Sequence, residues 1–132
     1  MYIDLLRKTT LMLLLAALYG GSSVSAAPIS QQEIIAVYSN SSSLSSNKQS
    51  LNYYAPDGEF RSTNIKSGEQ SLGRWHVTES GKLCIKSMKS KTERCWRITQ
   101  TKRKICFSAD GKSSCRAKKN FMRGDQTSQY IK

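Results

Sequence analysis

The chain has 132 residues and a formal net charge of +12, with 21 Lys and Arg against 9 Asp and Glu. A chain of that length is expected to form one small domain and is too short for several domains. The charge excludes a preference for cationic partners, because a field of this sign concentrates polyanions around the molecule.

The first 26 residues have the composition of a secretory signal peptide. MYIDLLRK carries Arg7 and Lys8, an apolar run of about ten residues follows, and GSSVSA is small and polar. The apolar run is shorter than the roughly 20 residues of a membrane-spanning helix. We expect cleavage after Ala26, a mature chain that begins at Ala27 with no transmembrane span, and a periplasmic or secreted location.

Residues 27–46 are expected to form a short helix followed by a flexible linker. Ser30 and Glu33 have the spacing of a capping box, in which each side chain bonds the backbone amide of the other residue. The helix should continue through Tyr38. The run NSSSLSS after it is typical of a polar, Ser-rich linker.

Residues 47–116 are expected to form an antiparallel β domain. LNYYAPDGEF reads as a strand, a turn at residues 56–58 and a second strand, whereas residues 61–72 are polar and predict a loop. GRWHVT, KLCIK, RCWRIT and KICFS are further short strands. The sequence therefore predicts a mainly β fold, a small antiparallel meander or barrel-like sheet with one short N-terminal helix, and a basic, flexible tail over residues 117–132.

Four cysteines (Cys84, Cys95, Cys106 and Cys115) lie in the predicted β domain. Their C-x10-C-x10-C-x8-C spacing lacks the C-x2-C pairs of zinc sites, so we expect no metal and no cofactor. An even number in a small exported chain indicates disulfides that clip the sheet. Pairing Cys84 with Cys95 and Cys106 with Cys115 is favoured because each bond closes one turn. A Cys95–Cys106 bond is the alternative, since those strands also neighbour each other.

Side-chain alternation along these strands predicts which face the cysteines occupy. Leu83 and Ile85 share one face of their strand, and Cys84 lies on the other. The strands around Cys95 and Cys106 repeat this pattern with their own apolar residues. We therefore expect the apolar side chains to form the core face of the sheet and the cysteines to lie opposite.

Four segments, taken in order, resemble one known family: EIIAVYS, YYAPDGEFR, GRWHVTESGKLCI and RCWRI. Over about residues 31–98 they are similar to the bacterial exported proteins grouped as domain of unknown function 995, found largely in alphaproteobacteria. The resemblance implies a small β-rich periplasmic or secreted domain with a Cys84–Cys95 disulfide. It implies no activity, because the function of the family is unassigned. The second cysteine pair and the basic tail lie beyond the recognised pattern.

Catalytic signals in the sequence are weak. The chain has no G-x-S-x-G elbow, no Gly-rich phosphate loop and no H-E-x-x-H motif. Asp57 and Glu59 flank a turn, where carboxylates are usually solvated, and His76 stands alone in a strand. Oxidised cysteines would supply no thiolate nucleophile. We therefore expect a protein that is not an enzyme. An enzyme acting on envelope polymers would have to use Asp57, Glu59 or His76.

Positive charge is concentrated in the second half of the chain. Residues 28–81 carry four basic and five acidic side chains, whereas residues 82–132 carry fifteen basic and three acidic ones. Arginine and lysine side chains bind phosphates and carboxylates. The predicted anion-binding residues are Lys86, Lys89, Lys91, Arg94, Arg97, Lys102, Arg103, Lys104, Arg116, Lys118 and Lys119.

We expect this half to bind an anionic envelope or host component, a glycan or a lipid. Nucleic acid is compatible with the charge, because contacts to its backbone need only cations. It is not favoured, because the aromatic side chains are better placed in the core than on a stacking surface. The alternative is a module that binds a protein partner, such as an inhibitor or an accessory subunit of an envelope complex.

Overall fold

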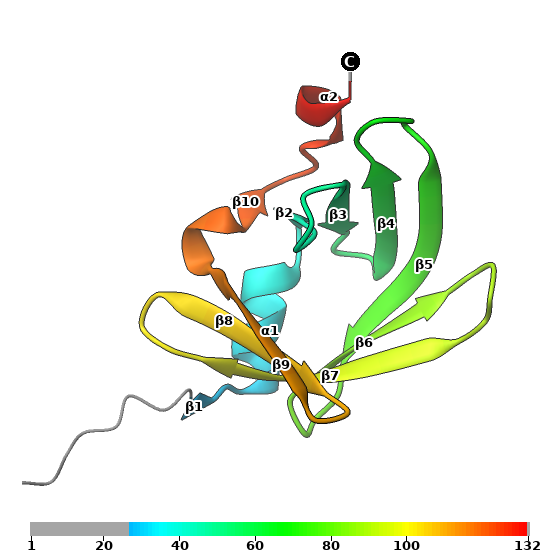
Figure 1. The fold of residues 1–132 in the computed structure, drawn as a ribbon. Helices are drawn as coiled ribbons and strands as arrows, with labels where there is room; N and C mark the ends of the chain where they lie inside the picture. Colours follow the sequence, from blue (N-terminus) through cyan, green and yellow to red (C-terminus); the bar gives the residue numbers. More distant parts are fainter. Residues whose placement is uncertain (1–26, 132) are drawn as a thin grey trace, which may run out of the picture.

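The computed structural model describes residues 27–131, so the predicted signal peptide lies outside the described part. Its strands form one antiparallel sheet in the order β10-β2-β3-β4-β5-β6-β7-β8-β9, with β1 paired to β7 (Figure 1). The strands are β1 (Ala27–Pro28), β2 (Ser41–Leu44), β3 (Ser50–Tyr54), β4 (Glu59–Asn64), β5 (Gln70–Val77), β6 (Lys82–Ser87), β7 (Glu93–Gln100), β8 (Lys104–Ala109), β9 (Lys112–Ala117) and β10 (Met122–Arg123). The helical segments are α1 (Gln31–Tyr38), η1 (Lys118–Asn120) and α2 (Thr127–Tyr130). The predicted mainly β fold with an N-terminal helix is confirmed. Within residues 27–131, no helix has the length and apolarity needed to cross a membrane.

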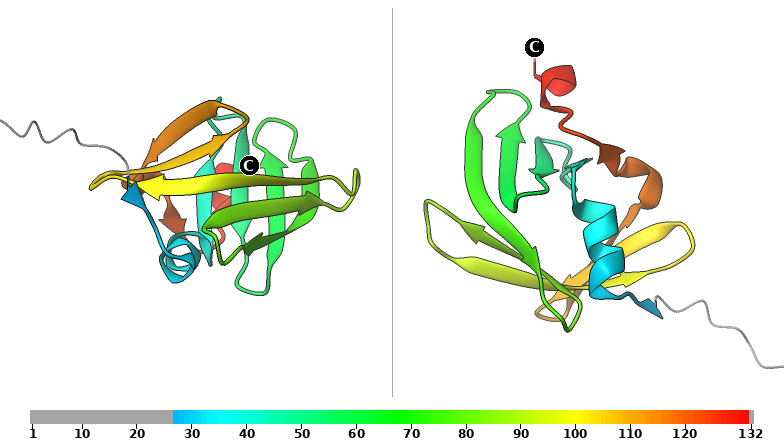
Figure 2. Two further views of the ribbon diagram at one scale, coloured as in Figure 1. Left: turned by 90° about the horizontal axis from the view of Figure 1, so that it is seen from below. Right: turned by 180° about the vertical axis from the view of Figure 1, so that it is seen from behind.

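The sheet curls into a half-barrel, and α1 packs against its inner face. Strands β2 to β5 run across the direction of β6 to β9, as the two views of Figure 2 show. Ile34 and Tyr38 of α1 are buried against Val77, Leu83 and other apolar side chains of the sheet. Helix α1 therefore covers apolar surface that the open side of the curled sheet would otherwise expose.

The predicted capping box begins α1. The Ser30 amide donates to Glu33 Oε2 at 2.9 Å, and the Glu33 amide donates to Ser30 Oγ at 3.2 Å. These two bonds satisfy amides that have no partner within the helix. The helix ends at Tyr38, whose ring lies buried in the core.

Alternation along β5 shows how the sequence builds the two faces of the sheet. Gly73, Trp75 and Val77 are buried, while the residues between them are exposed. On the later strands Leu83, Ile98 and Ile105 join the same core. The prediction that apolar residues share one face is confirmed.

Both disulfides join directly opposed residues of neighbouring strands. Cys84 pairs with Cys95 across β6 and β7, and Cys106 pairs with Cys115 across β8 and β9. The favoured pairing is therefore confirmed. The alternative Cys95–Cys106 bond does not form, because Cys106 lies opposite Thr99 of β7 instead.

The turn between β3 and β4 is held by the following strand. Asp57 Oδ1 accepts a hydrogen bond from the Glu59 amide at 2.9 Å, as expected for a turn aspartate. Trp75 Nε1 donates to the Ala55 carbonyl at 2.8 Å, and Arg74 donates to the Asp57 carbonyl at 2.8 Å. The YYAPDGEFR and GRWH segments therefore interlock as one structural unit.

The predicted loop over residues 61–72 contains parts of two strands. Strand β4 continues to Asn64 and β5 begins at Gln70, so the connection is short. Thr63 is buried, and Gln70 Nε2 donates to its hydroxyl at 3.3 Å. Polar side chains of β4 and β5 form hydrogen bonds with each other, and a search for alternating apolar residues does not detect such strands.

The Ser-rich segment is a buried strand, whereas the sequence predicts a flexible linker. Ser41, Ser42 and Ser43 of β2 are each at most 1% exposed. Ser41 Oγ donates to the Tyr38 carbonyl at 2.6 Å, and Ser42 Oγ donates to the Gly124 carbonyl at 2.7 Å. Only the Ser42 hydroxyl bonds a residue far along the chain, and among the described residues the buried Ser43 hydroxyl has no hydrogen-bond partner. The local composition carries no sign of this burial.

The predicted flexible tail contains η1, β10 and α2, and the segment 118–131 packs along β2; we call it the C-terminal strap. Residues of β10 pair with Ser41 and Ser42, and the Gly124 amide donates to the Asn40 carbonyl at 2.7 Å. Arg61 Nη1 donates to Asp125 Oδ2 at 2.8 Å. Backbone pairing and this ion pair hold the strap against the sheet. The basic composition of the segment therefore does not make it a separate tail.

Candidate anion-binding site

The predicted cations do not form one continuous patch. Lys89 and Lys91 lie in the turn between β6 and β7, whereas Lys102 and Arg103 lie in the turn between β7 and β8. These two hairpins point to opposite sides of the molecule (Figures 1 and 2). Lys118 joins the second group, because its amide donates to the Arg103 carbonyl at 2.8 Å.

Some of the predicted cations already have an acidic or aromatic side chain beside them. Lys86 lies opposite Glu93, and Arg94 lies over the Trp96 ring at 5.7 Å from its centroid. Arg97 lies between Lys82 and Ser108 on the convex face, beside an open hollow of about 470 Å³. The convex face is therefore positively charged but shallow.

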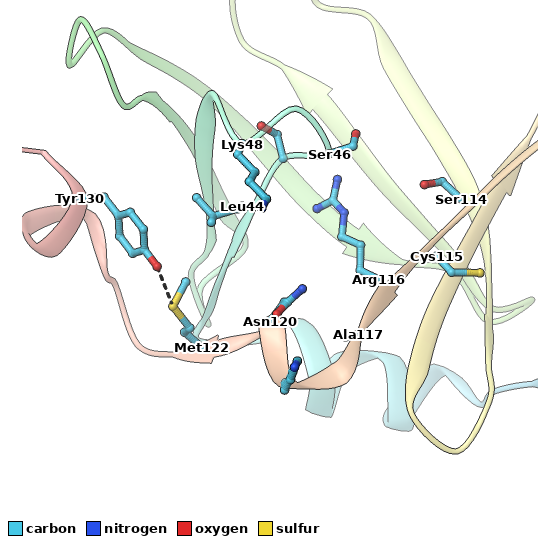
Figure 3. A pocket seen from close by; sticks show the side chains of 12 residues that line it. Leu44, Ser46, Lys48, Ser114, Cys115, Arg116, Ala117, Asn120, Met122 and Tyr130 are labelled. Carbon is cyan, nitrogen blue, oxygen red and sulfur yellow. Dashed lines mark hydrogen bonds between the residues drawn. The ribbon is translucent and has the colours of Figure 1, made fainter.

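A deeper site lies where the half-barrel fails to close. A cavity of about 420 Å³ separates β9 from the end of β2 and the β2–β3 turn (Figure 3). We call it the seam pocket, and it is lined by Leu44, Ser45, Ser46, Lys48, Ser114, Cys115, Arg116, Ala117, Lys119, Asn120, Met122 and Tyr130. Of the predicted anion-binding residues, Arg116 and Lys119 line it.

Arg116 is the central cation of the seam pocket. Cys115 faces outward to its disulfide, so alternation along β9 turns Arg116 inward, and Figure 3 shows it extending into the gap between β9 and the β2–β3 turn. Its guanidinium lies over the Phe107 ring, 5.1 Å from the centroid. Its Nε is buried and has no hydrogen-bond partner within residues 27–131. A buried donor without a partner is uncommon and favours a ligand that accepts from it.

Lys48 and Lys119 bring two further charges to the same pocket. In the described part of the chain, no carboxylate lies within 4.0 Å of either lysine or of Arg116. Lys48 is held in the β2–β3 turn with a positive φ of 57°. The turn is fixed by Ser45 Oγ, which donates to Asn47 Oδ1 at 2.7 Å.

The lining of the seam pocket suits a phosphate or a carboxylate. Three cations with no carboxylate within 4.0 Å among the described residues surround it. The hydroxyls of Ser46 and Ser114 and the side-chain amide of Asn120 add neutral hydrogen-bond donors. A guanidinium donates two parallel bonds to such a group, which fixes its orientation as well as its position. Arg116 is partly buried, whereas Lys48, Lys119 and the cations of the convex face are exposed. Partial burial strengthens the charged hydrogen bonds of Arg116 relative to those of the exposed cations.

A second cavity of about 260 Å³ opens on the inner face of the sheet and shares Arg116 with the seam pocket. We call it the inner hollow, and it is lined by Tyr38, Asn52, Tyr54, Phe60, Leu83, Ile85, Trp96, Phe107 and Arg116. Burial raises the pKa of Tyr54 to about 12, with the Arg116 guanidinium acting in the opposite direction. Burial likewise raises the pKa of Tyr38. Both phenols are therefore neutral hydrogen-bond donors at neutral pH.

Sequence reasoning missed Lys48 and the aromatic lining. Lys48 belongs to the half of the chain without excess charge, next to a segment that the composition assigns to a linker. It reaches the pocket because β2 and β9 approach each other at the seam, a long-range arrangement that no local motif reports. Side-chain alternation along the strand that contains Cys115 predicts that Arg116 points inward.

The weak catalytic candidates have structural partners. Asp57 holds its own turn, and Glu59 lies 3.4 Å from the Arg61 guanidinium. His76 Nδ1 lies 3.6 Å from Glu93 on the exposed face. In residues 27–131, His76, Cys84 and Glu93 place potential metal-ligand atoms within 4.8 Å of one another, but the Cys84 sulfur is in a disulfide. That leaves an imidazole and a carboxylate, fewer than a zinc site requires.

The family comparison covers most of the chain. The model of the family described as "Protein of unknown function (DUF995)" matches residues 9–119. The match extends beyond the segment recognised from the sequence and includes both cysteine pairs and the three cations of the seam pocket. No curated protein and no solved structure matches the chain. The chain belongs to the DUF995 family.

Proposed function

We propose that the protein is a non-enzymatic binding module for an anionic component of the envelope or of a host, held through the basic C-terminal half. The observation that carries the proposal is a set of three cations around one pocket, Lys48, Arg116 and Lys119, which have no carboxylate partner in the part of the chain that the structure describes. The buried, unpartnered Nε of Arg116 supports it further. The convex lysines and arginines act at longer range by drawing anions toward the molecule.

The compartment belongs to the same proposal. Two disulfides are typical of proteins that mature in oxidising compartments. The leader-like composition of residues 1–26 favours export to the periplasm or beyond. N-terminal sequencing of the mature protein should begin at Ala27. An intact leader on cytoplasmic protein would contradict the assignment.

A charge-matched pair of variants tests the pocket against the general field. Purified lipopolysaccharide serves as the anionic probe, titrated at low and at physiological salt. The triple variant Lys48→Gln, Arg116→Gln, Lys119→Gln removes three charges from the seam pocket. The control Lys102→Gln, Arg103→Gln, Lys104→Gln removes three charges from the β7–β8 hairpin.

The two variants should differ clearly. We expect the pocket variant to weaken binding by about tenfold or more, the scale of one or two lost charged hydrogen bonds. The hairpin variant should mainly reduce the association rate and the salt dependence. Equal losses would assign binding to the field alone and reject the pocket. A single protein partner retained at high salt, with no binding of the anion, would favour a protein-partner module instead.

A further inference from the structure

Arg116 joins two cavities of opposite chemistry. The seam pocket offers cations and hydroxyls, whereas the inner hollow is lined mainly by aromatic and aliphatic side chains. Its polar groups are Asn52, Arg116 and the phenol hydroxyls of Tyr38 and Tyr54. The inner hollow, at about 260 Å³, is smaller than the roughly 300–1,000 Å³ of ligand pockets. The inner hollow therefore fits only part of a ligand, and Arg116, which lines both cavities, lies where that part would meet the part in the seam pocket.

The apolar lining of the inner hollow is unusually accessible. Phe60, Ile85, Trp96 and Phe107 pack against the core, yet each remains partly exposed. Ile98 and Ile105, on the strands of Trp96 and Phe107 but outside the lining, are buried. Contact between large apolar side chains and water is unfavourable, so an apolar group that enters the hollow is stabilised by displacing that water.

We propose that the ligand of this site is a single-chain amphiphile, one anionic head group on one short alkyl or acyl chain. The head binds Arg116 with Lys48 and Lys119, and the chain enters the inner hollow against Trp96 and Phe107. This identification of the ligand class rests on the proposed anion-binding function. A purely polar glycan would leave the hollow unfilled, and a lipid with two long chains exceeds its volume.

A set of small probes separates head from tail. Octyl phosphate, kept below its micelle-forming concentration, is titrated by calorimetry beside inorganic phosphate, octanol and octanoate. We expect octyl phosphate to bind in a one-to-one complex about a hundredfold more tightly than inorganic phosphate, equivalent to burying only a few methylene groups. Comparison with octanoate tells whether the head group is a phosphate or a carboxylate, and tighter binding of either satisfies the proposal.

The head-group contact is tested at Arg116. Arg116→Gln should weaken octyl phosphate binding by about tenfold to a hundredfold, because charged hydrogen bonds are lost. Lys112→Gln removes the same charge at the start of β9, outside both cavities, and should leave the affinity within about twofold at physiological salt. Thermal unfolding of both variants shows whether the fold is retained.

The tail contact is tested by filling the hollow. Ile85→Trp adds bulk inside it and should reduce the affinity for octyl phosphate to that for inorganic phosphate, without changing the latter. Met88→Trp is the matched control, because Met88 is 62% exposed in the neighbouring turn. If Ile85→Trp fails to fold, a series from butyl to dodecyl phosphate replaces it. Affinity should then rise with chain length and level off when the hollow is full.

The outcomes separate this inference from the proposed function. Equal binding of octyl phosphate and inorganic phosphate, still sensitive to Arg116→Gln, overturns the amphiphile and leaves the anion pocket standing. Equal binding of octanol and octyl phosphate, insensitive to Arg116→Gln, overturns the anionic head and the proposed pocket with it. Absence of binding by every probe overturns both.

Discussion

The two halves of the sheet are held together in different ways. Strands β3 to β5 surround an aromatic cluster, in which Tyr54 packs against Phe60 and Trp75 with ring centroids 5.1 and 5.8 Å away. Strands β6 to β9 carry most of the positive charge, and β9 has no buried residue at all. Disulfides close the β6–β7 and β8–β9 hairpins instead. Covalent links thus add to the packing of the strands that carry most of the positive charge.

The largest expected effect comes from the aromatic half. Trp75→Ala removes a side chain that is only 8% exposed and its hydrogen bond to the Ala55 carbonyl. We expect a loss of about 3–5 kcal/mol in the free energy of unfolding, measured in urea with Trp96 fluorescence and circular dichroism. Leu72→Ala on the same strand is the control, because Leu72 is 45% exposed, and its effect should stay within about 0.5 kcal/mol. Similar losses for both would break the comparison.

Removing one disulfide from the basic half, β6 to β9, should lower the free energy of unfolding by less than Trp75→Ala does. Replacing Cys106 and Cys115 by Ser should cost about 2–4 kcal/mol. Because β9 pairs only with β8, amide exchange should accelerate mainly in β9, and binding at Arg116 should weaken. Replacing Cys84 and Cys95 should cost a similar amount and leave the seam pocket formed. Faster exchange in β9 after the second replacement than after the first would contradict this division.

The smallest expected effect on the free energy of unfolding comes from the ion pair between Asp125 of the C-terminal strap and Arg61 of β4. Burial acts to raise the pKa of Asp125, but hydrogen bonds from Thr127 and the Arg61 ion pair outweigh it, and the pKa lies below its usual value. This group therefore stabilises the fold above its unfolded pKa of about 3.9, and the contribution disappears as the pH falls through the lower folded value.

Asp125→Asn should accordingly lower the free energy of unfolding at neutral pH by about 0.2–1 kcal/mol, since the pair is partly exposed. Wild type and variant should converge as the carboxyl protonates in acid. Urea unfolding at a series of pH values measures both effects. Glu59→Gln is the control, because Glu59 lies farther from Arg61, at 3.4 Å. A difference that persists unchanged in acid would show that the ion pair is not its cause.

Local patterns predicted much of this fold because local chemistry builds it. The Ser30–Glu33 box begins α1, the Pro56-Asp57-Gly58 turn joins β3 to β4, and the cysteines close hairpins. Two predictions differ from the structure for one physical reason. Ser41 and Ser42 of β2 pair with the C-terminal strap, the Ser42 hydroxyl donates to the strap, and this pairing spans most of the described chain.

The candidate site was predicted less completely than the fold. Charge counting pointed to the correct half for Arg116 and Lys119, but it gave equal weight to lysines on two opposed hairpin tips. Composition cannot distinguish a solvated lysine from one that borders a cavity. That distinction follows from the curvature of the sheet, which brings Lys48 to the same place as Arg116.

The C-terminal strap also protects the sheet from self-association. Two residues of β10 cover part of the rim of β2, where main-chain amides and carbonyls would otherwise be free to accept another strand. A protein shortened before Met122 would present that rim, with its row of small serines, to neighbouring molecules. Its solubility, and not only its affinity for a ligand, would then fall.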